Sequence, residues 1–238
     1  MPNLSGRVDE PELLDTAPAS PAELRRALAF LAFTNQWCGG TRVVIRHLES
    51  WSARWPPGRV IRILDVGCGS ADILVSIARW ATKQGLRIAV SGIDLVESIA
   101  DLGRSRVQGV PGVSIEHGDV FELPERAVPY DYVTASLFLH HVRHDRAADA
   151  LRVFDRLALR GVIISDLHRT PAAYRAIRAA SLALGNAIVR HDAPLSVRRA
   201  FRIPELEALC REAGVRYLTA GIEPFFRVSL AGEKPDAW

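Results

Sequence analysis

Residues 62–74 read RILDVGCGSADIL and place a Gly-x-Gly turn between a run of apolar residues and a helix-forming segment. The apolar run has the length and composition of a buried strand. Gly67 and Gly69 lack Cβ atoms, so the backbone can turn tightly there and a ligand can approach it closely. In open α/β sheets, ligands bind beyond the carboxyl ends of the strands. The stretch therefore predicts an α/β fold and the position of its binding site.

Strand-like and helix-like segments alternate around and after this stretch. Strand-like runs cover residues 60–66, 87–94, 113–119, 130–138 and 161–167, and helical patterns cover 70–83, 96–107 and 144–158. This alternation predicts a mostly parallel, Rossmann-like sheet with helices on both faces. Residues 215–222 and 225–232 are two further strand-like runs, joined by a link too short for a parallel crossover. We therefore expect an α/β fold with a seven-stranded sheet that ends in a C-terminal antiparallel hairpin.

The segments outside this alternation suggest how the chain is organised. Residues 1–19 are acidic and rich in proline, which predicts a disordered leader. Helical patterns at 21–33 and 41–51 predict an N-terminal helical cap over residues 20–55, ahead of a main domain at 58–238. Residues 168–202 are largely helical and too long for a simple connection, so we expect an insertion over the sheet edge there.

Composition sets limits on the class of protein. The chain has 238 residues, 48% of them hydrophobic, and a net charge of +3, which permits nucleic acid as a partner without implying it. It has no uncharged apolar run long enough to span a membrane. Cys38, Cys68 and Cys210 are odd in number and far apart, a spacing that fits neither a zinc site nor a disulfide framework. We expect a cytoplasmic enzyme in a reducing compartment, monomeric or homodimeric.

Charge decides which ligand suits the glycine turn. A dinucleotide-binding turn needs a third small residue, but Asp72 stands in that position. Asp65 lies just ahead of the glycines, and a like charge about 4 Å away costs on the order of 4 kcal/mol at an effective dielectric of 20. The same carboxylate would favour a positively charged ligand by a comparable gross amount. The turn therefore favours a cationic group over a phosphate.

Two further acids follow the next strands. Asp94 ends the second strand, where a carboxylate can accept hydrogen bonds from both hydroxyl groups of a ribose. Asp119 follows the third strand, where a carboxylate can accept a hydrogen bond from an adenine amino group. The expected ligand has an ammonium or sulfonium group, a ribose and an adenine, and lacks phosphate. S-adenosylmethionine meets this description, and S-adenosylhomocysteine would be its product.

The stretches LDVGCGSAD (64–72), GIDL (92–95), HGDVFELP (117–124) and YDYVTASLFLHH (130–141) resemble class I S-adenosylmethionine-dependent methyltransferases, in this order and spacing. More narrowly, they are similar to small-molecule methyltransferases of the quinone and polyketide type. The similarity covers about residues 58–165, and the closing hairpin also matches that fold. Ala71 departs from the family pattern, which commonly has glycine there; we expect a slightly tighter turn.

The resemblance implies roles for the residues of these motifs. Those that it places around the cofactor are Asp65, Gly67, Cys68 and Gly69 at the methionine moiety, Asp94 and Leu95 at the ribose, Asp119 and Val120 at the adenine, and Ala135 and Ser136 near the methionine amine.

His140 and His141 are the candidate catalytic residues. They lie just past the fourth strand, at the edge where the cofactor's methyl group should point. Histidine has an unperturbed pKa near 6.5, which suits a general base for a phenol or alcohol at neutral pH. A structural role for the pair stays open, and we do not assign the base to one of the two. In-line displacement from a sulfonium requires no metal, and we predict none.

The residues expected to contact the acceptor substrate are less clearly marked. Asn35 and Trp37 lie in the break between the two N-terminal helices, which in many relatives folds over the cofactor. His191 and Asp192 are placed to form an imidazole–carboxylate pair, or to lie in a surface loop with Asp192 as a helix cap. Arg199 belongs to an arginine-rich stretch that would suit an acidic substrate or a solvated face.

Three functions remain open from the sequence. The first is methyl transfer to a small-molecule acceptor, at a phenolic or quinone-like hydroxyl group or at a ring carbon. The second is RNA methylation, although the place after the fourth strand lacks the Asn/Asp-Pro-Pro-aromatic and Pro-Cys motifs of base methyltransferases. The third is a non-catalytic domain that binds S-adenosylmethionine without turnover.

Overall fold

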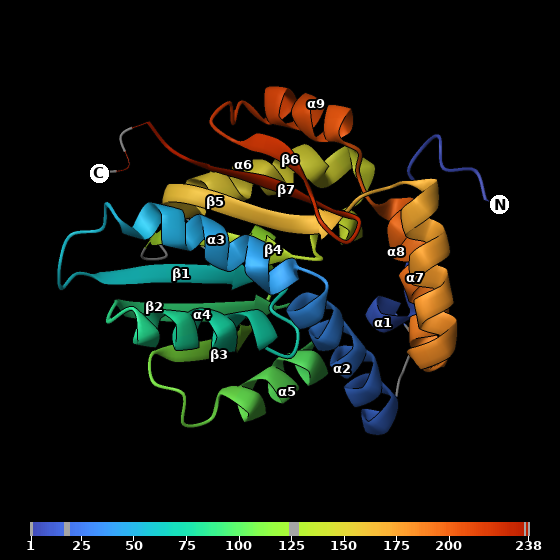
Figure 1. Ribbon diagram of the computed structural model, residues 1–238, viewed down its shortest axis with the longest axis horizontal. Helices are drawn as coiled ribbons and strands as arrows, with labels where there is room; N and C mark the ends of the chain where they lie inside the picture. Colours follow the sequence, from blue (N-terminus) through green and yellow to red (C-terminus); the bar gives the residue numbers. More distant parts are fainter. Residues whose placement is uncertain (1, 17–19, 124–128, 236, 238) are drawn as a thin grey trace.

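The computed structural model describes residues 2–16, 20–123, 129–235 and 237, and within them one sheet of seven strands forms the centre of the molecule (Figure 1). The strands are β1 (Val60–Val66), β2 (Arg87–Asp94), β3 (Val113–His117), β4 (Tyr130–Ser136), β5 (Ala158–Leu167), β6 (Thr219–Glu223) and β7 (Arg227–Glu233). Their order is β3-β2-β1-β4-β5-β7-β6, with β1 to β5 parallel and β7 antiparallel to both of its neighbours. The predicted fold class, including the closing hairpin, is confirmed.

The register of the sheet brings the chemistry-bearing residues to one edge. Val66 at the end of β1 is level with Ile93 on β2 and with Ala135 on β4. The next residues along those strands, Asp94 and Ser136, therefore lie on either side of the Gly67–Gly69 turn. This edge is the carboxyl end of the parallel strands, as the sequence predicted.

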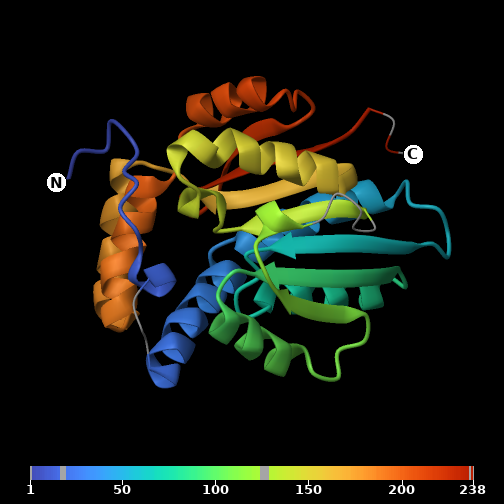
Figure 2. The same cartoon turned by 180° about the vertical axis from the view of Figure 1, so that it is seen from behind.

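Helices cover both faces of the sheet. The helices α3 (Gly40–Ser52), α4 (Asp72–Lys83) and α5 (Glu97–Val107) lie on one face, and α6 (Ala147–Leu157) and α9 (Ile203–Ala213) lie on the other, which Figure 2 shows from behind. Each face has its own cluster of buried apolar side chains. Ile63 and Leu74 belong to the first and Val133 and Phe154 to the second, all at most 2% exposed. Burial of the strands on both faces explains their near-continuous apolar runs.

The helix α2 (Pro21–Trp37) begins as predicted but extends four residues further. Ser20 and Glu23 form a capping box at its start, with Pro21 in the first turn. The polar residues expected to break the helix instead continue it, because their side chains find partners. Thr34 donates a hydrogen bond to the carbonyl oxygen of Leu31 (2.8 Å), and the side chain of Asn35 is buried.

The expected insertion at 168–202 forms a helical hairpin of α7 (Pro171–Leu184) and α8 (Ala187–Arg199). Thr170 and Asn186 cap the two helices through their side chains. The pair stands beyond the carboxyl ends of the strands, next to α2 (Figure 1). It therefore forms a wall in front of the predicted site.

The N-terminal segment differs from the predicted disordered leader. Residues 2–16 follow the surface of α8 and end in the short helix α1 (Leu13–Thr16), while residues 17–19 lie outside the described residues. Leu4 is buried, and the two carboxylate oxygens of Asp192 accept hydrogen bonds from the backbone N–H groups of Leu13 and Leu14, each at 2.9 Å. The local composition did not reveal this packing because its partners lie some 180 residues further along the chain.

In the part of the chain that the structure describes, no helix combines the length and the apolar character needed to cross a lipid bilayer.

Candidate active site

The glycine turn adopts a conformation that only small residues accept easily. Gly67 and Gly69 have φ values of +64° and +54°, in the left-handed region. A Cβ atom on Gly67 would lie 2.6 Å from a ring carbon of Phe138, whereas Gly69 faces open space. Ala71 also has a left-handed φ, +64°, at the position where a glycine was the expected family residue. This residue therefore tightens the turn at some cost in backbone strain.

Three carboxylates surround this turn and line one cavity of about 280 Å³, which we call the turn cavity. Asp65 accepts a hydrogen bond from the Thr134 hydroxyl group (2.7 Å). Asp94 accepts hydrogen bonds from the backbone N–H groups of Gly69 (2.9 Å) and Val96 (3.1 Å). Asp72 begins α4. Two of the acids expected from the sequence, Asp65 and Asp94, are therefore brought together here with their side chains held by hydrogen bonds, and Asp72 joins them.

Burial raises the pKa values of these carboxyl groups. The pKa of Asp65 rises to about 7, because burial and the neighbouring charges of Asp72 and Asp94 outweigh the hydrogen bond from Thr134. The pKa values of Asp72 and Asp94 are also raised, in both cases mainly by burial. Burial raises the pKa of the Cys68 thiol as well, so this residue stays protonated. Among the residues that the structure describes, Asp65 forms no salt bridge, so the acidic groups of the turn cavity favour a positively charged ligand.

Asn35 and Ser136 also line the turn cavity. Asn35 donates a hydrogen bond to Asp72 (3.1 Å) and accepts one from the Arg227 guanidinium (3.0 Å), which lies on β7. Arg227 is fully buried, and burial lowers its pKa to about 10. Sequence reasoning missed Arg227. The buried bonds of Asn35 tie α2 to the sheet at this point.

A second cavity of about 260 Å³ continues from the first, sharing Gly67, Leu95, Phe138 and His141 with it. We call it the Asp119 cavity. Asp119 precedes the short helix η1 (Val120–Glu122) and accepts a hydrogen bond from the Phe121 N–H group (2.9 Å). Asp119 and Val120 both line it, as predicted. Ala135 does not line either cavity, because its side chain is fully buried in the core.

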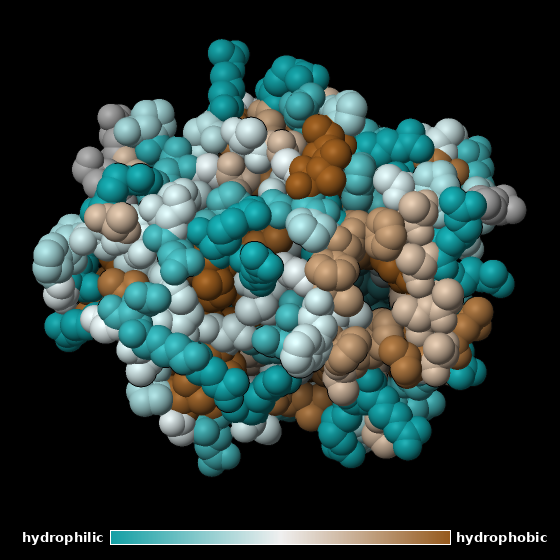
Figure 3. Space-filling model, viewed as in Figure 1, coloured by the Kyte–Doolittle hydropathy of each residue, from teal (hydrophilic) through white to brown (hydrophobic). Residues whose placement is uncertain are grey.

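A third cavity, of about 230 Å³, is lined mainly by apolar side chains and is called the apolar cavity here. Its walls come from α2, α7, α8 and the hairpin between β6 and β7; Phe30, Ile177, Val189 and Phe226 are representative. Figure 3 shows a hollow surrounded by apolar residues on this side of the molecule. The apolar cavity shares Leu14, Leu31, Leu137 and His141 with the turn cavity, so the two meet at these four residues.

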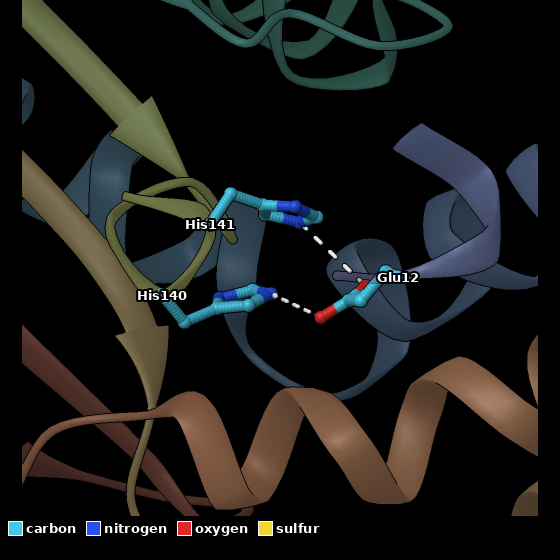
Figure 4. Close-up of side chains that lie close together, drawn as sticks. All are labelled: Glu12, His140 and His141. Carbon is cyan, nitrogen blue, oxygen red and sulfur yellow. Dashed lines mark ion pairs between the residues drawn. The ribbon is translucent and has the colours of Figure 1, made fainter. Parts of the chain in front are cut away.

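His140 and His141 stand at one end of the apolar cavity, in the short helix η2 (Leu139–His141). Both rings point toward Glu12 from the N-terminal segment (Figure 4). Nε2 of His140 lies 3.7 Å from one oxygen of Glu12, and Nε2 of His141 lies 3.8 Å from the other. Glu12 and His140 are buried, and His141 is partly exposed.

Each histidine also forms a hydrogen bond to a second carboxylate, through the ring nitrogen that faces away from Glu12. Nδ1 of His140 donates to Asp166 at the end of β5 (2.6 Å), and Nδ1 of His141 donates to Asp15 in α1 (2.7 Å). Burial alone would lower the pKa of His141, but the carboxylates of Glu12 and Asp15 raise it to about 9. Burial alone would raise the pKa of Asp166, but the hydrogen bonds and charge of His140 lower it. The carboxylates around His141 therefore favour its protonated form.

Three residues expected at the acceptor substrate have other positions. Trp37 is 68% exposed and lines none of the cavities described above, because the longer α2 turns its side chain outward. His191 pairs with Asp192 (2.7 Å), as one interpretation had it, but the ring is half exposed outside the apolar cavity. Arg199 is buried and donates hydrogen bonds to the carbonyl oxygens of His140 (3.0 Å) and His141 (2.7 Å). It shapes the histidine loop and leaves no free guanidinium for a substrate.

Sequence reasoning also missed Glu12, Asp15 and Asp166. Glu12 and Asp15 belong to the segment predicted to be disordered. Asp166 did carry a signal, because it stands at the end of a strand in the same way as Asp65 and Asp94 do.

Residues 63–161 match the family described as "Methyltransferase domain". A demethylmenaquinone methyltransferase from Staphylococcus aureus is 32% identical over 82 residues, which is 34% of this chain and 33% of that protein. The chain thus spans about a third of the length of the curated relatives it matches.

Solved structures extend the likeness over most of the chain. The plantazolicin methyltransferase BpumL in complex with S-adenosylhomocysteine has a TM-score of 0.67 at 14% identity and covers 93% of each chain. Magnesium protoporphyrin IX methyltransferase from Synechocystis, also with bound S-adenosylhomocysteine, has a TM-score of 0.57 at 16% identity and covers 82% of each chain. At these identities the likeness establishes the fold.

Proposed function

We propose that this chain, which belongs to the class I S-adenosylmethionine-dependent methyltransferases, moves the cofactor's methyl group to an apolar small molecule. The acceptor atom that we propose is the oxygen of a phenolic or quinone-like hydroxyl group, with a ring carbon as the alternative. The relatives named for demethylmenaquinone and for magnesium protoporphyrin IX support an acceptor with a large flat ring system.

The charges of the turn cavity support S-adenosylmethionine as the cofactor. Its ammonium and sulfonium groups are cations, and Asp65 and Asp72 offer carboxylates at the end of the cavity near α2. Asp94 is held by two backbone N–H groups and keeps lone pairs for the ribose hydroxyl groups. The adenine would continue into the Asp119 cavity. A dinucleotide would place its phosphates against these acids.

The single observation that carries the proposal is the meeting of the turn cavity and the apolar cavity at Leu137 and His141. Leu137 has a φ of +54°, a strained conformation for a residue with a side chain, and such strain is often found at functional sites. A cofactor in one cavity and an acceptor in the other would have their reacting atoms side by side. Methyl transfer needs this proximity more than any covalent help from the protein.

The chemistry at the junction is an in-line displacement. The acceptor oxygen forms a bond to the methyl carbon while the carbon–sulfur bond breaks and sulfur keeps the electron pair. The hydroxyl proton must leave before or during this step. Glu12, His140 and His141 lie at the polar end of the apolar cavity, where the carboxylate or an imidazole would accept this proton.

A melting curve with S-adenosylhomocysteine tests cofactor binding. At about 100 times its dissociation constant the ligand adds roughly 2.7 kcal/mol, which corresponds to a rise of roughly 5 to 11 °C for a chain of this size. We expect Asp94→Ala to remove most of the rise, and Asp101→Ala, at an exposed acid on α5, to keep it. A rise with NADH and none with S-adenosylhomocysteine would contradict the cofactor assignment.

Transfer of a labelled methyl group to a panel of phenols and hydroxyquinones tests the reaction. We expect product with at least one apolar acceptor and none with RNA. A protein that binds S-adenosylhomocysteine but labels no acceptor would instead be a non-catalytic binding domain, and labelling of RNA alone would contradict the small-molecule proposal.

A further inference from the structure

Glu12, His140 and His141 each direct one potential ligand atom to the same point, with these atoms all within 4.8 Å of one another (Figure 4). We propose that the three residues bind a divalent first-row transition-metal ion such as Zn²⁺, in a site that opens into the apolar cavity. This differs from the sequence expectation of no metal. The inference rests on the proposed function only for the role of the ion, and the site itself is argued from the residues alone.

The carboxylates behind the histidines are the first support. Asp166 accepts from Nδ1 of His140 and Asp15 accepts from Nδ1 of His141, which fixes the tautomer of both rings and leaves each Nε2 directed toward Glu12. A carboxylate bound to the far nitrogen of a ligand histidine is the usual arrangement around protein-bound metal ions, because it orients the ring and raises its basicity. Here both histidines have it.

The spacing of the ligand atoms is the second support. Ligands about 2.0–2.2 Å from one ion lie roughly 3.0–3.6 Å from each other. The two Nε2–Oε distances, 3.7 and 3.8 Å, run to different oxygens of Glu12, and one ligand atom from each residue lies within 4.8 Å of the other two. An inward movement of about 1–2 Å at most brings these atoms into this range. Two imidazoles and one carboxylate are the ligands that Zn²⁺ and its neighbours in the first transition row prefer, whereas Mg²⁺ and Ca²⁺ prefer oxygen alone.

The charges around the site are the third support. The acids facing it are Glu12, Asp15, Asp166 and Asp192, and the cations facing it are Arg7, Arg199 and Arg227. Arg199 lies 3.9 Å from Glu12, and its guanidinium is directed mainly at backbone carbonyl oxygens. A buried divalent ion would offset the remaining negative charge.

The position of the site gives the ion a role in the proposed reaction. With three protein ligands, at least one coordination position stays open, as in catalytic zinc sites. The same three side chains line the apolar cavity, so that position faces the acceptor. An acceptor hydroxyl group bound there would release its proton to water and remain on the metal as an oxyanion. This oxyanion then attacks the methyl carbon, and the electron pair of the carbon–sulfur bond stays on sulfur.

Cobalt(II) provides a direct test of the site, because its visible d–d absorption reports ligand geometry. The full chain is dialysed against EDTA, transferred to pH 8 and titrated with Co²⁺, and bound Co²⁺ is then competed with Zn²⁺. We expect one Co²⁺ per chain, displaced by Zn²⁺. Absence of d–d bands at millimolar Co²⁺ would overturn the site.

Four variants locate the ion. Glu12→Gln and His141→Ala should weaken Co²⁺ binding about 100-fold or more, and Asp15→Asn, which removes a backing carboxylate, about 10- to 100-fold. His191→Ala is the matched control, since this exposed histidine lies outside the cavity, and it should bind as the parent does. A cooperative thermal unfolding transition, followed by circular dichroism without ligand, verifies that each variant is folded. Equal binding in all variants would place the ion elsewhere and overturn the site.

Methyl transfer by the metal-free protein separates the two proposals. We expect the rate to fall at least tenfold on chelation and to return with Zn²⁺ or Mn²⁺. An unchanged rate in the metal-free protein would overturn the role of the ion while leaving the methyltransferase proposal in place. Tight Co²⁺ binding without methyl transfer to any acceptor would support the metal site and contradict the methyltransferase proposal.

Discussion

The two ends of the site are built in different ways. The cofactor end consists of residues at or just past the carboxyl ends of β1, β2 and β3, so three short stretches of sequence supply Asp65, Asp94 and Asp119. The acceptor end is assembled from the N-terminal segment, α2, the α7–α8 hairpin, the loop after β4 and the β6–β7 turn. The first region is local in sequence, and the second exists only once the whole chain has folded.

This difference separates what each region contributes to function. A motif after a strand positions its side chains through the register of the sheet, so the cofactor end tolerates little change. The acceptor end is a wall of apolar side chains with one polar cluster, and its shape depends on how the segments pack. Disturbing one region should therefore affect cofactor affinity, and disturbing the other should affect turnover with little loss of cofactor binding.

Gly69→Ala should produce the largest effect, on the cofactor end alone. The φ of +54° costs an alanine about 1 kcal/mol, and the new Cβ would project into open space in the unliganded protein. Because Gly69 lines the turn cavity, we expect affinity for S-adenosylhomocysteine, measured by calorimetry, to fall about 100-fold, or about 2.7 kcal/mol. Gly58→Ala, with a φ of +75° and open space around it, is the control for backbone strain. Equal affinity in both variants would show that the ligand does not approach the turn.

Asp192→Ala should break the acceptor end by releasing the N-terminal segment. The variant removes both hydrogen bonds to Leu13 and Leu14 and with them the support of Glu12 and Asp15. We expect the methyl-transfer rate to fall roughly 10- to 100-fold, because each bond to a charged group contributes about 1.5–3 kcal/mol to holding the segment. Hydrogen exchange of residues 2–16 should increase. Unchanged exchange and rate would mean that the segment is held by its other contacts.

The pH dependence of cofactor binding should report Asp65. Its pKa near 7 keeps it largely neutral at pH 6 and ionised at pH 8, and the cofactor's ammonium group prefers the carboxylate. Affinity for S-adenosylhomocysteine should therefore rise about tenfold between these two values. Asp65→Asn should bind S-adenosylhomocysteine more weakly, and its affinity should no longer rise between pH 6 and pH 8. The same rise in the variant as in the parent would assign the titration to Asp72 or Asp94.

Asp65 should also affect the stability of the unliganded protein, in the opposite direction. In the unfolded chain its pKa returns to about 3.9, so between pH 4 and pH 7 the native state binds more protons. Its contribution to the free energy of unfolding therefore falls as pH rises through this range and is constant above it. We expect the free energy of unfolding, measured by denaturant titration at several pH values, to fall more steeply with pH in the parent than in Asp65→Asn within this range.

Two aromatic residues of α2 give the smallest expected effects and define the wall of the apolar cavity. Phe30 lines the cavity, so Phe30→Ala should raise KM for the acceptor several-fold, with little change in cofactor affinity. Trp37 is 68% exposed, and Trp37→Ala should change neither value by more than about twofold. A larger effect at Trp37 than at Phe30 would favour the lid that the sequence suggested.

Sequence reasoning reached the fold and the cofactor end for the same physical reason. The period of the apolar residues fixes strands and helices, and the parallel strands then place Asp65, Asp94 and Asp119 at one edge of the sheet. It also placed His140 and His141 at that edge. Ala135 was misjudged by a single position, because side chains alternate between faces and its neighbour Ser136 is the one that reaches the turn cavity.

The acceptor end could not be predicted in the same way. Glu12 meets His140 across 128 positions, and the residues that hold Glu12 in place lie on α8; no periodicity or motif encodes such a contact. Charge alone suggested that Arg199 is free for a substrate, whereas in the fold it satisfies the carbonyl oxygens of the histidine loop. Contacts between distant segments determined both outcomes.

A crystal structure of the full chain with S-adenosylhomocysteine tests the central claim, that the two regions meet where the methyl group is transferred. The account predicts the adenosine along Asp94 and Asp119 and the sulfur atom at the junction of Leu137 and His141, facing the apolar cavity. A sulfur atom that faces solvent, or lies with protein side chains between it and the apolar cavity, would contradict it.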